Sequence, residues 1–201
     1  MRHEPAQATA TVILMHGRGT TPDDLAPLAH RLPDGVSAIL PQAPFPFPPD
    51  MPFGRAWYGM PPGHEEALRE SAGYVKELLD EVTGKDPVRA QRVVLAGFSQ
   101  GGVMALEVGL TYAPRLAGVV CMSGYLFSTP SSPVSAPPVC ISHGRDDDVV
   151  GIQRARDSRR QLEALGIEPE YEEFDIPHTI SEESWTYVTH FIERSLHRPE
   201  A

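Results

Sequence analysis

Residues 95–102 read LAGFSQGG and place one serine, Ser99, among glycines. The residues before it, 92–96, form a short apolar run with β-branched side chains, which predicts a buried strand. Residues 103–108 predict a helix, so we expect Ser99 at a sharp corner between strand and helix. The span from Gly97 to Gly101 fits the pattern G-x-S-x-G, the nucleophile elbow, where side chains flanking the serine would collide with neighbouring backbone.

The rest of the chain alternates between strand-like and helix-like segments. Further strands are expected at 9–15, 36–40, 117–122, 139–142 and 170–174. Helices are expected from Thr21 or Asp23 to about residue 31, and at 65–82, 152–165 and 182–196. This alternation predicts an α/β fold with a largely parallel central sheet and helices on both faces. Segment 41–62 is rich in proline and aromatic residues, which indicates a long ordered loop.

Length and composition limit the class of protein. The 201 residues suffice for one substantial core, so we expect a single domain over residues 1–201 with no separate cap domain. A formal net charge of −10 would repel a phosphate backbone, so no nucleic-acid partner is expected. No secretory signal is recognisable and no apolar run approaches the roughly 20 residues that span a bilayer. A cytoplasmic location without stable membrane association is therefore expected.

The sequence contains two cysteines, Cys121 and Cys140, and both lie in apolar runs that look like core strands. Buried free thiols are the expected state, because cysteine behaves as a small hydrophobic residue in a core. A single disulfide between adjacent strands is the alternative. The eight histidines are scattered, with no pair at helical ligand spacing beside a carboxylate, so no metal site and no cofactor are expected.

Candidate partners for Ser99 follow it in the chain. Residues 146–148 are three aspartates directly after a predicted strand, and His178 follows the last predicted strand. The order Ser, Asp, His is that of the α/β-hydrolase fold. In that arrangement His178 would take the Ser99 proton during attack on a carbonyl, and an aspartate would orient the imidazole and stabilise its charge. The residues alone leave Asp146, Asp147 and Asp148 open as the acid.

Two backbone amides are candidates for the oxyanion hole, the pair of N–H donors that such a reaction needs. One belongs to Gln100, the residue after the nucleophile, and the other to Arg18, in the glycine-containing loop 16–19 after an early strand. His16 and His143 each precede a glycine at a predicted strand end. For these two histidines a structural hydrogen bond to loop backbone is expected rather than chemistry.

The aromatic residues of segment 41–62 suggest a substrate pocket. Trp57 and Phe53 are expected to line an apolar acyl pocket, the alternative being a loop that only packs on the sheet. The side chain of Arg18 is expected either in solvent or at the pocket mouth. Exposed apolar side chains in this segment could also support a homodimer.

Six motifs together resemble the phospholipase/carboxylesterase family of small α/β-hydrolases, which includes acyl-protein thioesterases. They are LMHGRG, LPQAPFPF followed by AWY, AGFSQGG, MSGYL, HGRDDDVV and PHTISEES, in the family's order from about residue 10 to residue 195. The resemblance implies an α/β-hydrolase fold. Its pattern of H-G, two variable residues and D implies that Asp147 is the acid.

Three positions depart from the family pattern. Asp148 stands where the family often has proline, so Asp146 or Asp148 stays open as the acid. Gly59 follows Trp57-Tyr58 where an acidic residue is common, and Pro177 precedes His178 where glycine is common. We therefore expect a pocket edge that differs from that of close relatives.

These observations predict a serine hydrolase that cleaves small-molecule carboxylic esters, or thioesters, through an acyl-enzyme. A lysophospholipase or acyl-protein thioesterase is the alternative that the resemblance permits, and it would need a long apolar channel. A noncatalytic ligand-binding protein on the same fold would predict a broken triad or a blocked oxyanion loop, neither of which the sequence has. A serine peptidase is the weaker alternative, because such enzymes usually carry an additional gating domain.

Overall fold

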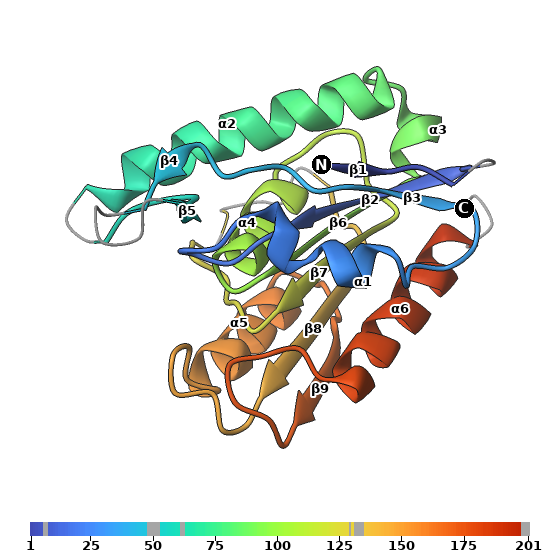
Figure 1. Ribbon diagram of the computed structural model, residues 1–201. Coiled ribbons are helices and arrows are strands. Elements are labelled where there is room, and N and C mark those ends of the chain that lie inside the picture. Colours follow the sequence, from blue (N-terminus) through green and yellow to red (C-terminus); the bar gives the residue numbers. More distant parts are fainter. Residues whose placement is uncertain (6–7, 48–52, 61–62, 129, 131–134, 198–201) are drawn as a thin grey trace.

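A computed structural model describes residues 1–5, 8–47, 53–60, 63–128, 130 and 135–197 (Figure 1). Its centre is a seven-stranded sheet in the order β1-β3-β2-β6-β7-β8-β9. The strands are β1 (Arg2–His3), β2 (Ala10–Met15), β3 (Val36–Ile39), β6 (Val93–Phe98), β7 (Gly118–Met122), β8 (Val139–Gly144) and β9 (Glu170–Phe174). Strand β1 pairs antiparallel with β3, and all other neighbours are parallel. The prediction of a largely parallel sheet is confirmed.

Helices cover both faces of this sheet. The main ones are α1 (Ala26–Ala29), α2 (His64–Thr83), α4 (Gln100–Gly109), α5 (Gln153–Ala164) and α6 (Glu182–Leu196). Apolar side chains of α2, α4 and α5 pack on one face, and those of α1 and α6 pack on the other. Figure 1 shows α1 and α6 on the opposite side of the strands from α4 and α5. Because both faces are covered, strands β2, β6, β7 and β8 are almost entirely buried, which explains why most of their residues are apolar.

Several short elements were not expected from the sequence. Strand β1 adds an antiparallel edge, and α3 (Pro87–Ala90) is capped by the Asp86 carboxylate, which accepts from the Val88 amide at 2.8 Å. The helix expected from Thr21 or Asp23 to residue 31 is split into a 3-10 turn, η1 (Pro22–Asp24), and the single turn α1. Pro22 and Pro27 each sit in a first turn, where proline is compatible with a helix start but not with a continuous helix.

The proline-rich segment contains a small hairpin. Strands β4 (Phe45–Pro46) and β5 (Arg55–Ala56) form a separate antiparallel pair beside the central sheet. A bridge between Thr20 and Arg55 ties this hairpin to the loop after β2. Residues 48–52 and 61–62 of the expected long loop lie outside the described residues. The hairpin therefore anchors both described parts of this segment to the core.

The two cysteines are free and lie on opposite faces of the sheet. Cys121 packs in the core on the α4 face, and Cys140 packs in the core on the α6 face. They sit in neighbouring strands one register position apart, where side chains alternate between faces, so they cannot reach each other. The expectation of buried free thiols is confirmed. In the described residues, no helix is long and apolar enough to cross a membrane.

Candidate active site

The strand-to-helix corner at Ser99 has the backbone of an elbow. Ser99 lies between β6 and α4 with φ 54° and ψ −119°, a conformation that L residues rarely adopt. A Cβ at Gly97 would collide with the backbone of Gly101, and a Cβ at Gly101 would collide with the carbonyl group of Met15. Only glycine fits at both positions, so these residues allow the tight turn that lifts Ser99 above the sheet edge.

Three side chains from three loops meet at this edge. Nε2 of His178 lies 3.0 Å from Oγ of Ser99, and Nδ1 of His178 lies 2.7 Å from Oδ2 of Asp147. The loops follow β6, β8 and β9, whose carboxyl ends lie together because the strands are parallel. Since a carboxylate can only accept, the Nδ1–H group donates to Asp147 and leaves Nε2 free to accept the serine proton.

Of the three consecutive aspartates, the structure brings Asp147 to His178. The side chain of Asp147 is fully buried, whereas Asp146 and Asp148 are exposed. The second carboxylate oxygen, Oδ1, accepts from the backbone amides of Val149 at 3.0 Å and Val150 at 2.8 Å. These bonds fix the carboxylate so that its other oxygen faces the imidazole.

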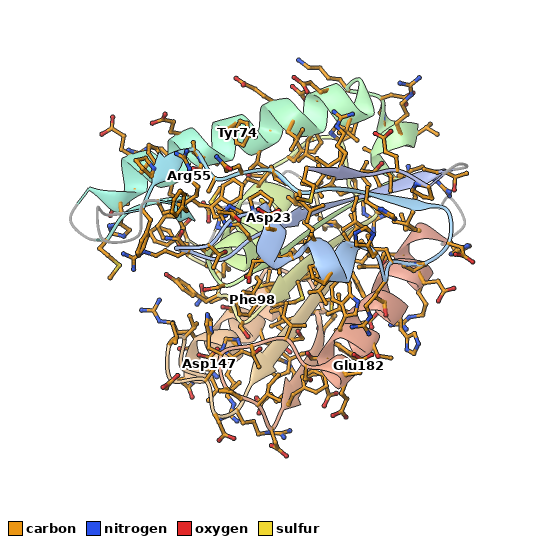
Figure 2. The ribbon with its side chains drawn as sticks, viewed as in Figure 1. Asp23, Arg55, Tyr74, Phe98, Asp147 and Glu182 are labelled. Carbon is orange, nitrogen blue, oxygen red and sulfur yellow. The ribbon has the colours of Figure 1, made fainter. Side chains whose placement is uncertain are left out.

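The side chain of Phe98, inside the elbow motif, packs against the imidazole of His178. Their ring centroids are 4.8 Å apart with an interplanar angle of 39°. Figure 2 shows Phe98 and Asp147 on the side of the molecule where the parallel strands end. The imidazole is thus fixed by a ring contact as well as by hydrogen bonds.

Of the two expected oxyanion donors, Gln100 directly follows Ser99 in the chain, and Arg18 belongs to a loop that approaches Ser99. Gln100 is the first residue of α4, so its amide has no acceptor within that helix. In the part of the chain that the structure describes, the Arg18 amide donates to no backbone carbonyl group. The preceding residue, Gly17, approaches Ser99 closely, since a Cβ built on it would lie 3.5 Å from the Ser99 Cβ. The Arg18 side chain is exposed and lies over the Phe47 ring at 4.9 Å.

His16 anchors the loop that carries Arg18. Its Nδ1 atom donates to the Gly17 carbonyl at 2.8 Å, and its Nε2 atom accepts from the Ala43 amide at 3.1 Å. Burial lowers the pKa of the imidazole below its ordinary value. A neutral ring is required here, because a protonated Nε2 could not accept the Ala43 amide. The expectation of a structural hydrogen bond to loop backbone is confirmed.

Trp57 and Phe53, expected to line the acyl pocket, occupy contrasting environments. Trp57 is fully buried, and its indole N–H donates to the His16 carbonyl at 2.9 Å. In this conformation its side chain offers no surface to a substrate, because it is buried against His16, at the start of the loop that carries Arg18. Phe53 is 86% exposed and borders segment 48–52, which is outside the described residues.

The side chain of Gln100 has a role that the sequence did not suggest. Its Oε1 atom accepts from the Trp57 amide at 3.0 Å, and its Nε2 atom donates to the Tyr58 carbonyl at 2.8 Å. One buried amide thus ties segment 57–58 to the start of α4. Only three-dimensional contact links these residues, so no local sequence signal could have indicated the interaction.

Among the side chains that the structure describes, no group of three or more His, Cys, Asp or Glu residues could hold a metal ion.

Known proteins resemble this chain along nearly its whole length. Acyl-protein thioesterase 1 of Emericella nidulans is 31% identical over 189 residues, which cover 80% of this chain and 78% of that protein. Among solved structures, esterase PE8 has a TM-score of 0.81 at 26% identity and covers 96% of this chain and 97% of that chain. Acyl-protein thioesterase 2 of Zea mays has a TM-score of 0.81 at 24% identity, with 98% of each chain covered, and supports the fold.

The sequence profile described as Phospholipase/Carboxylesterase matches residues 2–196. Esterase and thioesterase structures share its α/β-hydrolase fold. Because the profile match spans nearly the whole chain, the chain belongs to the phospholipase/carboxylesterase family of hydrolases.

Proposed function

We propose that this protein hydrolyses carboxylic esters through an acyl-enzyme on Ser99, with His178 as general base and Asp147 as the acid that orients it. The observation that carries the proposal is the hydrogen-bonded chain of these three residues. Oγ of Ser99 lies 3.0 Å from Nε2 of His178, and Nδ1 of His178 lies 2.7 Å from Oδ2 of Asp147. Such a chain activates a hydroxyl that is otherwise a poor nucleophile at neutral pH.

The reaction has two halves. The Ser99 oxygen attacks the ester carbonyl while His178 takes the serine proton, and the negative oxygen that forms accepts from the Arg18 and Gln100 amides. Collapse of this intermediate breaks the bond to the alcohol, which leaves with the proton from His178. A water molecule, deprotonated by His178, then attacks the acyl group. The second intermediate collapses as His178 passes that proton to the Ser99 oxygen, which releases the carboxylic acid and restores free Ser99. The charge on His178 is stabilised by Asp147 throughout.

The same residues can cleave a thioester, because the leaving thiol replaces the alcohol without changing any other step. This second candidate is favoured by the relationship to a protein named acyl-protein thioesterase 1. A lysophospholipase would use the same chemistry on a lipid ester. The acyl pocket, for which Phe53 remains a candidate lining residue, decides among these substrates.

A hydrolysis assay over a series of p-nitrophenyl esters from acetate to palmitate, together with an S-acylated peptide, tests the proposal. Ser99→Ala, Asp147→Asn and His178→Ala should each lower kcat by about 10³-fold or more. Matched controls are Asp148→Asn and His190→Ala, which change exposed residues of the same types. A wild-type protein that cleaves none of these substrates would favour a noncatalytic ligand-binding protein, and full activity in Ser99→Ala would show that Ser99 is not the nucleophile.

We also propose a cytoplasmic location, with which a chain whose two cysteines form no disulfide is compatible. A single domain over residues 1–201 accords with the one central sheet.

A homodimer through apolar side chains near segment 41–62 stays a prediction; Phe53 and Met60 are exposed there, at 86% and 62%. Light scattering of wild type and a Phe53→Ser, Met60→Ser variant tests the dimer, which the double substitution should dissociate.

A further inference from the structure

A second buried histidine lies beside the candidate acid. His143 is the penultimate residue of β8, and its side chain is fully buried. Its Nε2 atom lies 2.7 Å from the Val150 carbonyl oxygen. Because a carbonyl oxygen only accepts, the proton of the neutral ring is on Nε2. Its Nδ1 atom is buried without a hydrogen-bond partner among the described residues, so this ring is held through one nitrogen alone.

The Nε2 atom of His143 is connected to the Asp147 carboxylate in two ways, one direct and one through Val150. Nε2 of His143 lies 3.3 Å from Oδ2 of Asp147, the same oxygen that accepts from His178. The Val150 carbonyl accepts from His143, while the Val150 amide donates to Oδ1 of Asp147 at 2.8 Å. His143 thus holds the turn that holds the carboxylate, and its Nε2 atom also lies beside that carboxylate.

The surroundings of His143 favour the neutral ring. Burial lowers the pKa of the imidazole, and the nearby His178 acts in the same direction, whereas the Val150 carbonyl, Asp147 and Glu173 oppose the shift. A second proton would sit on Nδ1, where no acceptor is available among the described residues. The neutral tautomer can donate to the Val150 carbonyl without adding a second positive charge near His178.

We propose that His143 is a positioning residue for the candidate triad, and that its Nε2–H group fixes the Val150 turn and thereby the orientation of the Asp147 carboxylate toward His178. This inference rests on the proposed function, since it concerns the same reaction. The buried ring is not exposed to a substrate, so its effect reaches the reacting atoms only through Asp147. Loss of the donor should therefore change kcat and leave KM nearly unaltered.

Two substitutions separate the donor from the volume of the side chain. His143→Leu fills the site without a donor, and His143→Gln places an amide N–H group near the position of Nε2. We expect His143→Leu to lower kcat by about 10-fold to 100-fold with KM within about 2-fold of wild type. His143→Gln should recover kcat to within about 5-fold of wild type. An equal loss in both variants, or kcat unchanged within about 2-fold in His143→Leu, would overturn the inference.

A mutant cycle tests whether the effect passes through Asp147. In an Asp147→Asn background, His143→Leu should lower the residual kcat by less than about 2-fold, because the group that it positions is already altered. If His143→Leu costs the same factor in both backgrounds, the histidine supports the fold generally and is not a positioning residue. An inactive wild-type protein would instead refute the proposed function itself.

A spectroscopic test needs no variant that must fold. In ¹⁵N-histidine NMR of the wild-type protein at pH 7, the His143 ring should have a protonated Nε2 and an unprotonated Nδ1. Assignment uses the signal that disappears in His143→Gln or, if that variant does not fold, through-bond correlation to the His143 backbone. A protonated Nδ1, in either the other tautomer or the imidazolium, would contradict the inference.

Discussion

The Oδ2 atom of Asp147 lies 2.7 Å from Nδ1 of His178, while the aspartates on either side of Asp147 are exposed. Neighbouring residues with identical side chains therefore have different environments, and only the middle one is buried against the imidazole. This contrast supplies an internal control for the role of the acid.

Asp147→Asn should lower kcat by about 10³-fold to 10⁴-fold, because an amide can hold His178 in the wrong tautomer. Asp146→Asn and Asp148→Asn should each stay within about 3-fold of wild type, since their side chains are exposed. Steady-state kinetics on one p-nitrophenyl ester measures all three variants. A larger loss in Asp148→Asn than in Asp147→Asn would show that Asp148, and not Asp147, is the acid.

Phe98→Ala should lower kcat by about 10-fold, because the His178 ring would lose the aromatic surface against which it packs. Phe98→Leu, which keeps apolar volume, should lose less. KM and kcat measured separately, with circular dichroism to compare folding, check the expectation. Equal kcat in wild type and Phe98→Ala would show that hydrogen bonds alone orient the imidazole.

Arg18→Ala should retain kcat within about 3-fold on an uncharged ester, because the proposed oxyanion donor is the backbone amide, which alanine preserves. The exposed guanidinium over Phe47 is not needed for that contact. The measurement is kcat on p-nitrophenyl acetate, with Ser99→Ala as the inactive reference. A loss of 10³-fold in Arg18→Ala would mean that the side chain itself acts in the reaction.

Gln100→Ala should lower the free energy of unfolding by about 1–3 kcal/mol, since it leaves the Trp57 amide and the Tyr58 carbonyl group without their buried partner. Urea denaturation measures the change. The variant keeps the Gln100 backbone amide, so residual activity in the folded fraction is expected. Unchanged stability would contradict the view that this side chain ties segment 57–58 to α4.

Stability should fall as the pH drops below about 6.5, the ordinary pKa of histidine, because His16 and His143 have lowered pKa values in the folded protein. Between that value and the lower folded-state pKa values, the unfolded chain binds more protons. Urea denaturation at pH 7.5 and pH 5.5 should show the loss. The loss should shrink in His143→Gln, which removes one titrating ring, and persist in His190→Ala, where the histidine is exposed.

The sequence predicted the central architecture because its signals are local. Strands β2, β6, β7 and β8 are rich in apolar residues, and the elbow glycines surround Ser99 within five residues. The order of Ser99, the aspartates and His178 also indicated which loops should meet. Choosing Asp147 among its neighbours required the family pattern, because burial of one side chain in a three-aspartate run has no local signature.

Other features depend on contacts between distant segments. Strand β1 and the hairpin of β4 and β5 are two residues long per strand, too short to produce an alternating pattern. Trp57 looked like a pocket residue because it is aromatic and lies in a loop, yet its indole is buried beneath His16. The position of Trp57 follows from its hydrogen bonds to Gln100 and His16, which lie 43 and 41 positions away in the chain.

Mass spectrometry tests most directly whether Ser99 is the nucleophile. The protein is quenched in acid during turnover of a p-nitrophenyl ester and then analysed by peptide mapping. We expect a mass increase of one acyl group on the peptide that contains Ser99, and no such adduct in Ser99→Ala. Turnover without any acylated Ser99 peptide, or an acyl group on a different residue that persists in Ser99→Ala, would contradict the central claim that Ser99 is the nucleophile.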